Sequence, residues 1–67
     1  MDDVEKHYTT MEVAEFLQVS VRTMERWRAD GAGPRHVVLG GLYRYPRSAV
    51  LEFLEKRTVQ TKTEVPA

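Results

Sequence analysis

The sequence predicts a mainly α-helical domain that carries one small β-hairpin. Three features lead to this fold class: two short amphipathic segments lie three residues apart, a diglycine separates two β-rich stretches, and a third amphipathic segment follows. A chain of 67 residues can bury one small core but not two. We therefore predict one folded domain at residues 8–57, between a flexible N-terminus at 1–7 and a disordered tail at 58–67.

The first helix is predicted at residues 10–17. Thr9 and Glu12 have the spacing of a capping box, in which each side chain accepts a hydrogen bond from the backbone of the other residue. The apolar positions then form one stripe, made of Val13, Ala14, Phe16 and Leu17. Glu12 and Glu15 lie on the other side, and they are more typical of a solvated face than of a catalytic pair.

The second helix is predicted at residues 20–30, after a three-residue connection that contains Val19 and ends at the capping residue Ser20. One side carries Val21, Met24 and Trp27, and the opposite side carries Arg22, Arg26 and Ala29. We expect Trp27 to anchor the helix in the core, with stacking on a nucleic-acid base as the alternative. Two helices joined this tightly form a helix-turn-helix, whose second helix projects from the domain.

A hairpin and a third helix complete the domain. Gly31 and the pair Gly33-Pro34 end the second helix, and β-rich residues 37–39 and 42–45 flank Gly40-Gly41. We expect at least one of the two hairpin tyrosines, Tyr43 and Tyr45, to pack on the core. Pro46 is predicted at the first position of a helix that runs to about Arg57. Its stripe should close the core against the first helix and Trp27, and it comprises Ala49, Val50, Leu51, Phe53 and Leu54.

The charge is unevenly distributed, although the net charge is zero. Residues 1–19 have a net charge of minus four, and residues 20–47 have a net charge of plus four. Every basic residue of this central segment is an arginine, the side chain best suited to forked contacts with phosphate and guanine. A local basic patch is what a phosphate backbone meets, so the segment indicates nucleic-acid binding. A solvated basic face is the alternative.

Composition excludes several other classes of protein. The chain has no cysteine, which excludes disulfides and cysteine-based metal sites and fits a reducing cytoplasm. It has no apolar run of the length of a signal peptide or a membrane span. His7 and His36 have no further ligand at metal spacing, and no nucleophile motif or phosphate loop is present. We expect no enzymatic activity, cofactor, metal, small-molecule ligand or membrane partner.

The order of elements and three motifs resemble the small MerR-like winged helix-turn-helix proteins, and most of all the phage excisionases, or recombination directionality factors. The motifs lie at residues 9–17, at 19–27, where the sequence is VSVRTMERW, and at 40–47, where it is GGLYRYPR. The resemblance covers residues 8–56 and implies a DNA-binding protein of the bacterial host cytoplasm. Excisionases bind adjacent sites cooperatively, often head to tail, bend double-stranded DNA and direct a tyrosine integrase toward excision. Metal- and drug-sensing MerR regulators continue into a long dimerisation helix, which we do not expect here.

The resemblance also implies a set of DNA-binding residues: Ser20, Val21, Arg22, Thr23, Arg26, Arg28, Arg44 and Arg47. Arg22 and Arg26 are the best candidates for base contacts, and Thr23 is better placed for a phosphate. Arg28 projects near the Met24 side of the helix, so it either contacts a phosphate or covers the core with its aliphatic stem. The resemblance assigns Arg44 to a groove or phosphate contact of the hairpin.

Two other functions remain open at this point. One is a small MerR-like transcription regulator that acts as a dimer. The other is an interaction module whose basic helix docks onto an acidic protein such as integrase or polymerase. The apolar residues Val21 and Leu42 have no evident core partner, which favours the interaction module. Alternatively, these two residues form the contact between copies that associate head to tail on DNA.

Overall fold

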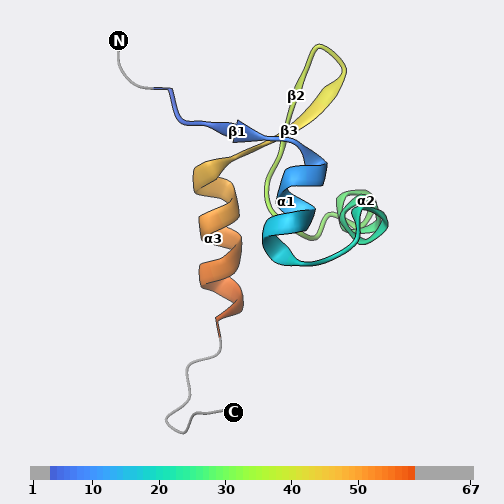
Figure 1. Cartoon of the computed structure of the whole chain (residues 1–67), viewed down its shortest axis with the longest axis vertical. Helices are drawn as coiled ribbons and strands as arrows, with labels where there is room; N and C mark the ends of the chain where they lie inside the picture. Colours follow the sequence, from blue (N-terminus) through green and yellow to red (C-terminus); the bar gives the residue numbers. More distant parts are fainter. Residues whose placement is uncertain (1–3, 59–67) are drawn as a thin grey trace, which may run out of the picture.

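Three helices and three short strands make up the domain, as the computed structural model shows for residues 4–58 (Figure 1). Residues 1–3 and 59–67, which hold most of the predicted tail, lie outside the described residues. In chain order the elements are β1 (His7–Tyr8), α1 (Thr10–Leu17), α2 (Val21–Asp30), β2 (Val37–Leu39), β3 (Leu42–Pro46) and α3 (Arg47–Arg57). The predicted winged helix-turn-helix is confirmed.

The helix-turn-helix begins and ends at the residues that the sequence indicates. The Thr9 hydroxyl accepts from the Glu12 amide at 3.0 Å, and the Thr9 amide donates to the Glu12 carboxylate at 2.9 Å. Ser20 caps α2, and Gly31 ends it in the left-handed conformation with φ 75°. Both helices agree with the predicted bounds to within one residue, because Thr9, Ser20 and Gly31 each give a local signal.

The three strands form one antiparallel sheet in the order β1-β3-β2. β2 and β3 form the predicted hairpin, with Leu39 opposite Leu42 at its end. Gly40 and Gly41 make the turn, with φ values of 58° and 83° that glycine adopts without strain. We call residues 37–46 the wing, which extends beyond the helices (Figure 1).

Strand β1 begins in the segment that we predicted to be flexible, and that prediction is wrong for residues 5–7. The strand pairs with β3, and the Lys6 carbonyl accepts from the Arg47 amide at 3.0 Å. The Glu5 carboxylate accepts from the amide and the hydroxyl of Ser48, at 2.7 and 2.9 Å. A strand of two residues has no periodicity in the sequence, and its partners lie far along the chain.

Helix α3 begins at Arg47, one residue later than predicted. Pro46 is the last residue of β3 and keeps an extended backbone, with φ −63° and ψ 145°. Proline has no backbone N–H to donate. The Ser48 amide, in the first turn of α3, donates instead to the Glu5 carboxylate, which therefore satisfies one of the free amides at this helix end. The helix ends at Arg57, as predicted.

The core lies where α1, α2 and α3 meet β3. Its buried residues are Val13, Ala14, Met24, Tyr45, Ala49 and Val50. Trp27 packs against this cluster, with its ring centroid 5.5 Å from that of Phe53, so its predicted role as a core anchor is confirmed.

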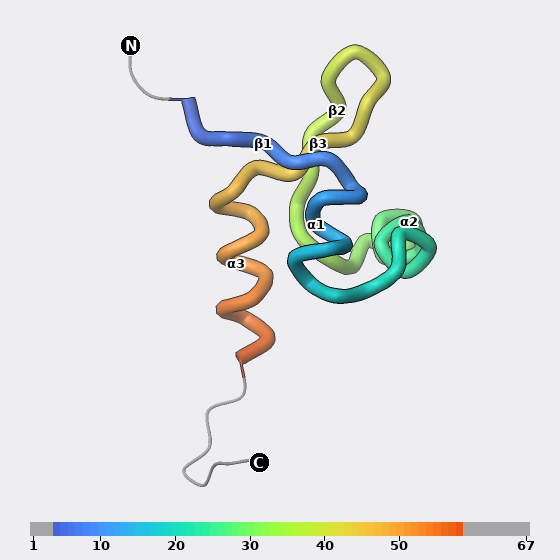
Figure 2. Tube along the Cα trace, in the orientation of Figure 1, coloured from blue at the N-terminus to red at the C-terminus, as the bar shows by residue number. Residues whose placement is uncertain are grey.

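The predicted closure of α3 against α1 is only partly correct. Phe16 of α1 is 56% exposed, and Leu51 and Leu54 of α3 are 47% and 45% exposed. Helix α3 is held instead by its packing on β3 and by the contact of Phe53 with Trp27. Helices α1 and α3 lie beside each other (Figure 2), and apolar side chains on both remain partly exposed.

Candidate nucleic-acid interface

Helix α2 presents two arginines on the face opposite its buried residue. Met24 is 1% exposed and anchors the helix in the core, whereas Arg22 and Arg26 are exposed. Neither guanidinium takes part in a hydrogen bond or an ion pair within residues 4–58. Side chains four residues apart on a helix lie about 5–6 Å from each other at Cβ, so the two arginines can act on neighbouring groups.

The N-terminus of α2 carries two hydroxyl groups that bind each other. The Ser20 hydroxyl accepts from the Thr23 amide at 3.0 Å and donates to the Thr23 hydroxyl, also at 3.0 Å. The Thr23 hydroxyl thus keeps its own proton for an outside acceptor. Val21 lies beside them and is 37% exposed, so it belongs to the surface more than to the core stripe in which we placed it.

Arg28 points toward the wing, away from Arg22 and Arg26. Its guanidinium donates to the Tyr45 hydroxyl at 2.9 Å and to the Thr10 hydroxyl at 3.4 Å. The same group lies 3.8 Å from the ring centroid of Tyr43. This geometry favours the alternative in which Arg28 covers the core, and its contact with DNA stays a prediction.

The wing presents its two tyrosines and Arg44 on opposite faces. Val37 lies opposite Arg44, and the alternation along β3 places Tyr43 and Tyr45 on the other face, the one that contacts Arg28. Tyr45 is 1% exposed, which confirms that at least one tyrosine packs on the core. The Arg44 guanidinium donates to the carbonyl of Tyr43 at 2.8 Å. The end of the wing is apolar and exposed at Val38, Leu39 and Leu42.

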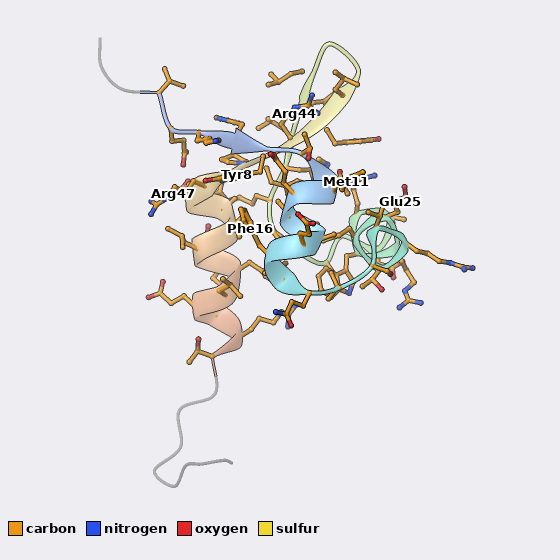
Figure 3. The ribbon with its side chains drawn as sticks, in the orientation of Figure 1. Tyr8, Met11, Phe16, Glu25, Arg44 and Arg47 are labelled. Atoms are coloured by element: carbon orange, nitrogen blue, oxygen red, sulfur yellow. The ribbon has the colours of Figure 1, made fainter. Side chains whose placement is uncertain are left out.

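The other two central arginines lie apart from α2. Arg47 lies at the start of α3, and α1 separates it from α2 (Figure 3). Glu25 lies on the side of α2 that faces away from α1. Arg35 binds Glu52 through two nitrogens, at 3.0 and 3.1 Å. Hydrogen bonds from Arg35, and then from Lys56, hold the pKa of the Glu52 carboxyl below its ordinary value. The structure therefore brings only Arg22 and Arg26 together on one face.

The tyrosine partners of Arg28 are the main feature that the sequence analysis missed. The available signal was the helical position of Arg28, on the same side as Met24 and so toward the body of the domain.

The histidines lie in structural contacts: His7 Nδ1 is 2.9 Å from the Glu5 carbonyl oxygen, and the His36 ring packs near Tyr43. Within residues 4–58, no three acidic or histidine side chains are grouped so as to hold a metal ion.

Comparison with known families identifies the class of protein. Residues 8–58 match the family model of a helix-turn-helix domain, so the chain belongs to this family, which includes excisionase-like small DNA-binding proteins. The family and the exposed basic helix together define a DNA-binding helix-turn-helix protein. Comparisons with curated proteins and with solved structures give no significant match. In the part of the chain that the structure describes, no helix has the length and apolar character needed to cross a bilayer.

Proposed function

We propose that α2 enters the major groove of double-stranded DNA and that Arg22 and Arg26 read base edges there. The observation that carries the proposal is the pair of exposed guanidinium groups, one turn apart and without partners in residues 4–58. Arginine binds the O6 and N7 atoms of guanine with two parallel hydrogen bonds, and two arginines one turn apart suit neighbouring base pairs. The small side chain of Ala29 on the same face permits a close approach.

In this proposal the residues around the base-reading pair position the helix. Ser20, Val21 and Thr23 lie at the N-terminus of α2, where backbone amides and the Thr23 hydroxyl favour a phosphate. Arg44 contacts the DNA backbone beside the major groove. Arg28 and Arg47 lie away from this surface, and they reach phosphates only where the duplex curves toward them.

We further propose an excisionase role. Copies of the protein occupy adjacent sites cooperatively, bend the DNA and direct a tyrosine integrase toward excision in the cytoplasm of a bacterial host, without catalysis of their own. The support is the resemblance in the three motifs and the membership of a family that includes excisionase-like proteins. A small MerR-like regulator that binds as a dimer is the second candidate, because the same helix-turn-helix serves both roles.

The test is selection of bound duplexes from a random library at near-physiological salt, followed by footprinting of the recovered sites. Direct repeats that fill cooperatively and bend would support the excisionase role. A single palindrome would favour the dimeric regulator. Weak binding that is indifferent to sequence and strongly dependent on salt would reject base reading and favour an interaction module. The exposed side chains of Val21 and Leu42 also favour an interaction module.

A further inference from the structure

An apolar groove runs between α1 and α3. Phe16 forms the wall on the α1 side, and Leu51 and Leu54 form the wall on the α3 side; all three side chains are about half exposed. The ring of Tyr8 closes one end of the groove by an edge-to-face contact with Phe16, at 5.1 Å between centroids. In Figure 3, Phe16 lies between α1 and α3, whereas α2 lies on the far side of α1.

Two hollows follow one another along this groove. The first, of about 230 Å³, is lined by Tyr8, Phe16 and Leu51 among others, and the second, of about 400 Å³, lies beside Leu17 and Phe53. Leu54 borders both hollows, so they form one continuous surface along α3.

The charged residues that line these hollows are both cations. Arg47 lines the first hollow and Arg57 the second, at the two ends of α3. They are ten positions apart, which corresponds to about 15 Å along a helix. The Arg57 guanidinium lies over the ring of Phe53 at 4.6 Å, and neither arginine has an ion-pair partner within residues 4–58.

We propose that this groove binds an amphipathic helix of a partner protein, with an apolar stripe against the groove and an acidic residue near each end. A channel between two helices is suited to a third helix, whose apolar side chains enter at intervals of three and four residues. The two arginines favour an acidic residue near each end of the partner helix. The spacing between them corresponds to about three turns of that helix. A second copy that presented the same face would bring cations against cations, which disfavours self-association through this groove.

This inference goes beyond DNA recognition and does not depend on it. The first hollow lies on the side of α1 away from α2, and the second reaches Trp27, which packs against the core. A duplex held by the exposed Arg22 and Arg26 on the opposite face of α2 therefore leaves the groove open to a partner. The protein would then hold a second protein beside its DNA site.

The test uses two synthetic helical peptides of three to four turns that share a leucine stripe. One carries glutamates near both ends, spaced to meet Arg47 and Arg57, and the other carries lysines at the same positions. Binding to the whole chain is measured by fluorescence anisotropy, and the site is mapped by amide chemical shifts. We expect the glutamate peptide to bind at least tenfold more tightly, with shifts around Phe16 and Leu54.

Charge reversal provides the matched controls. The double variant Arg47→Glu, Arg57→Glu should invert the preference in favour of the lysine peptide. Lys56→Glu changes a cation on the other side of the same helix, where Lys56 pairs with Glu52, and should leave the preference unchanged. Leu54→Ser should weaken both peptides, and circular dichroism of each variant checks that the helices persist.

Four results of the peptide experiments would overturn the proposal, and one result without peptide would do the same. They are equal affinity for the two peptides, no binding of either, shifts confined to α2, and peptide binding that begins only after residues 59–67 are removed. Groove shifts that appear with increasing protein concentration in the absence of peptide would also overturn it, since they would identify a second copy as the occupant.

Discussion

The guanidinium of Arg28 lies 3.8 Å from the ring centroid of Tyr43 and donates a hydrogen bond of 2.9 Å to the hydroxyl of Tyr45. One side chain of α2 thus contacts two residues of β3, and it joins α2 to the wing. The Tyr45 side chain is buried, so its hydroxyl depends on this bond. These contacts within the protein therefore set the angle between α2 and the wing.

Arg28→Met should lower the free energy of unfolding by about 2 kcal/mol, because hydrogen bonds to charged groups contribute roughly 1.5–3 kcal/mol. Methionine keeps an apolar stem over the core and removes the cation and the donor. Urea unfolding measures the loss. DNA affinity should fall for all duplexes while its dependence on salt stays unchanged; a salt slope lower by about one would instead show that Arg28 contacts a phosphate.

Tyr45→Phe is the matched partner for a double-mutant cycle, because it removes only the acceptor. The cost of the two substitutions together should be smaller than the sum of the single costs, by about 0.5–3 kcal/mol. Additive costs would show that the bond between Arg28 and Tyr45 does not couple α2 to the wing in solution.

The sequence predicted those parts of the fold that local signals determine. The bounds of α1 and α2 follow from the caps at Thr9, Ser20 and Gly31, which act within a few residues. The pairing of β1 with β3 and the exposure of Phe16 depend on how segments far apart in the chain pack together. No local sequence pattern predicts that packing.

The same division holds for the candidate site. Helical periodicity alone placed Arg22 and Arg26 on an exposed face. The contacts of Arg28 with the wing, and of Arg35 with Glu52 on α3, are made between residues 15 or more positions apart in the chain. Their partners become visible only when the elements are assembled.

Arg22→Ala and Arg26→Ala should each lower the affinity for the selected DNA site by about 1–3 kcal/mol and relax the preference at one base position. Arg44→Ala should weaken binding to all duplexes alike and flatten the salt dependence, because a phosphate contact carries no sequence information. Binding to a panel of single-base variants at several salt concentrations separates the two effects.

Arg35→Ala serves as the control for these substitutions, since Arg35 is engaged by Glu52. It should change neither the base preference nor the salt slope appreciably. If all four variants lost affinity equally on every duplex, the assignment of base reading to α2 would be wrong.

Gly33→Ala should destabilise the domain more than Gly31→Ala. Both glycines have positive φ, 81° and 75°, and an L-residue in the left-handed region costs about 1–2 kcal/mol. A Cβ at Gly33 would also lie 3.1 Å from Cβ and 3.2 Å from Cε3 of Trp27, whereas a Cβ at Gly31 would meet nothing within 4 Å. Thermal unfolding followed by the fluorescence of Trp27, the sole tryptophan, compares the two; equal losses would show that the Trp27 ring yields without cost.

Glu5→Gln should lower the melting temperature near neutral pH and have little effect in acid. Hydrogen bonds from the backbone and then the side chain of Ser48 hold the pKa of the Glu5 carboxyl below its ordinary value of 4.5. A carboxyl with a lowered pKa in the folded state adds stability above that ordinary value, and the added stability disappears as the pH falls through the folded pKa. The difference in Tm between wild type and variant should therefore be constant above pH 4.5 and shrink below it. Ser48→Ala, which removes one of the two donors, should give a smaller difference in the same pH range. A difference that persists unchanged into strong acid would mean that the charge of Glu5 does not stabilise the start of α3.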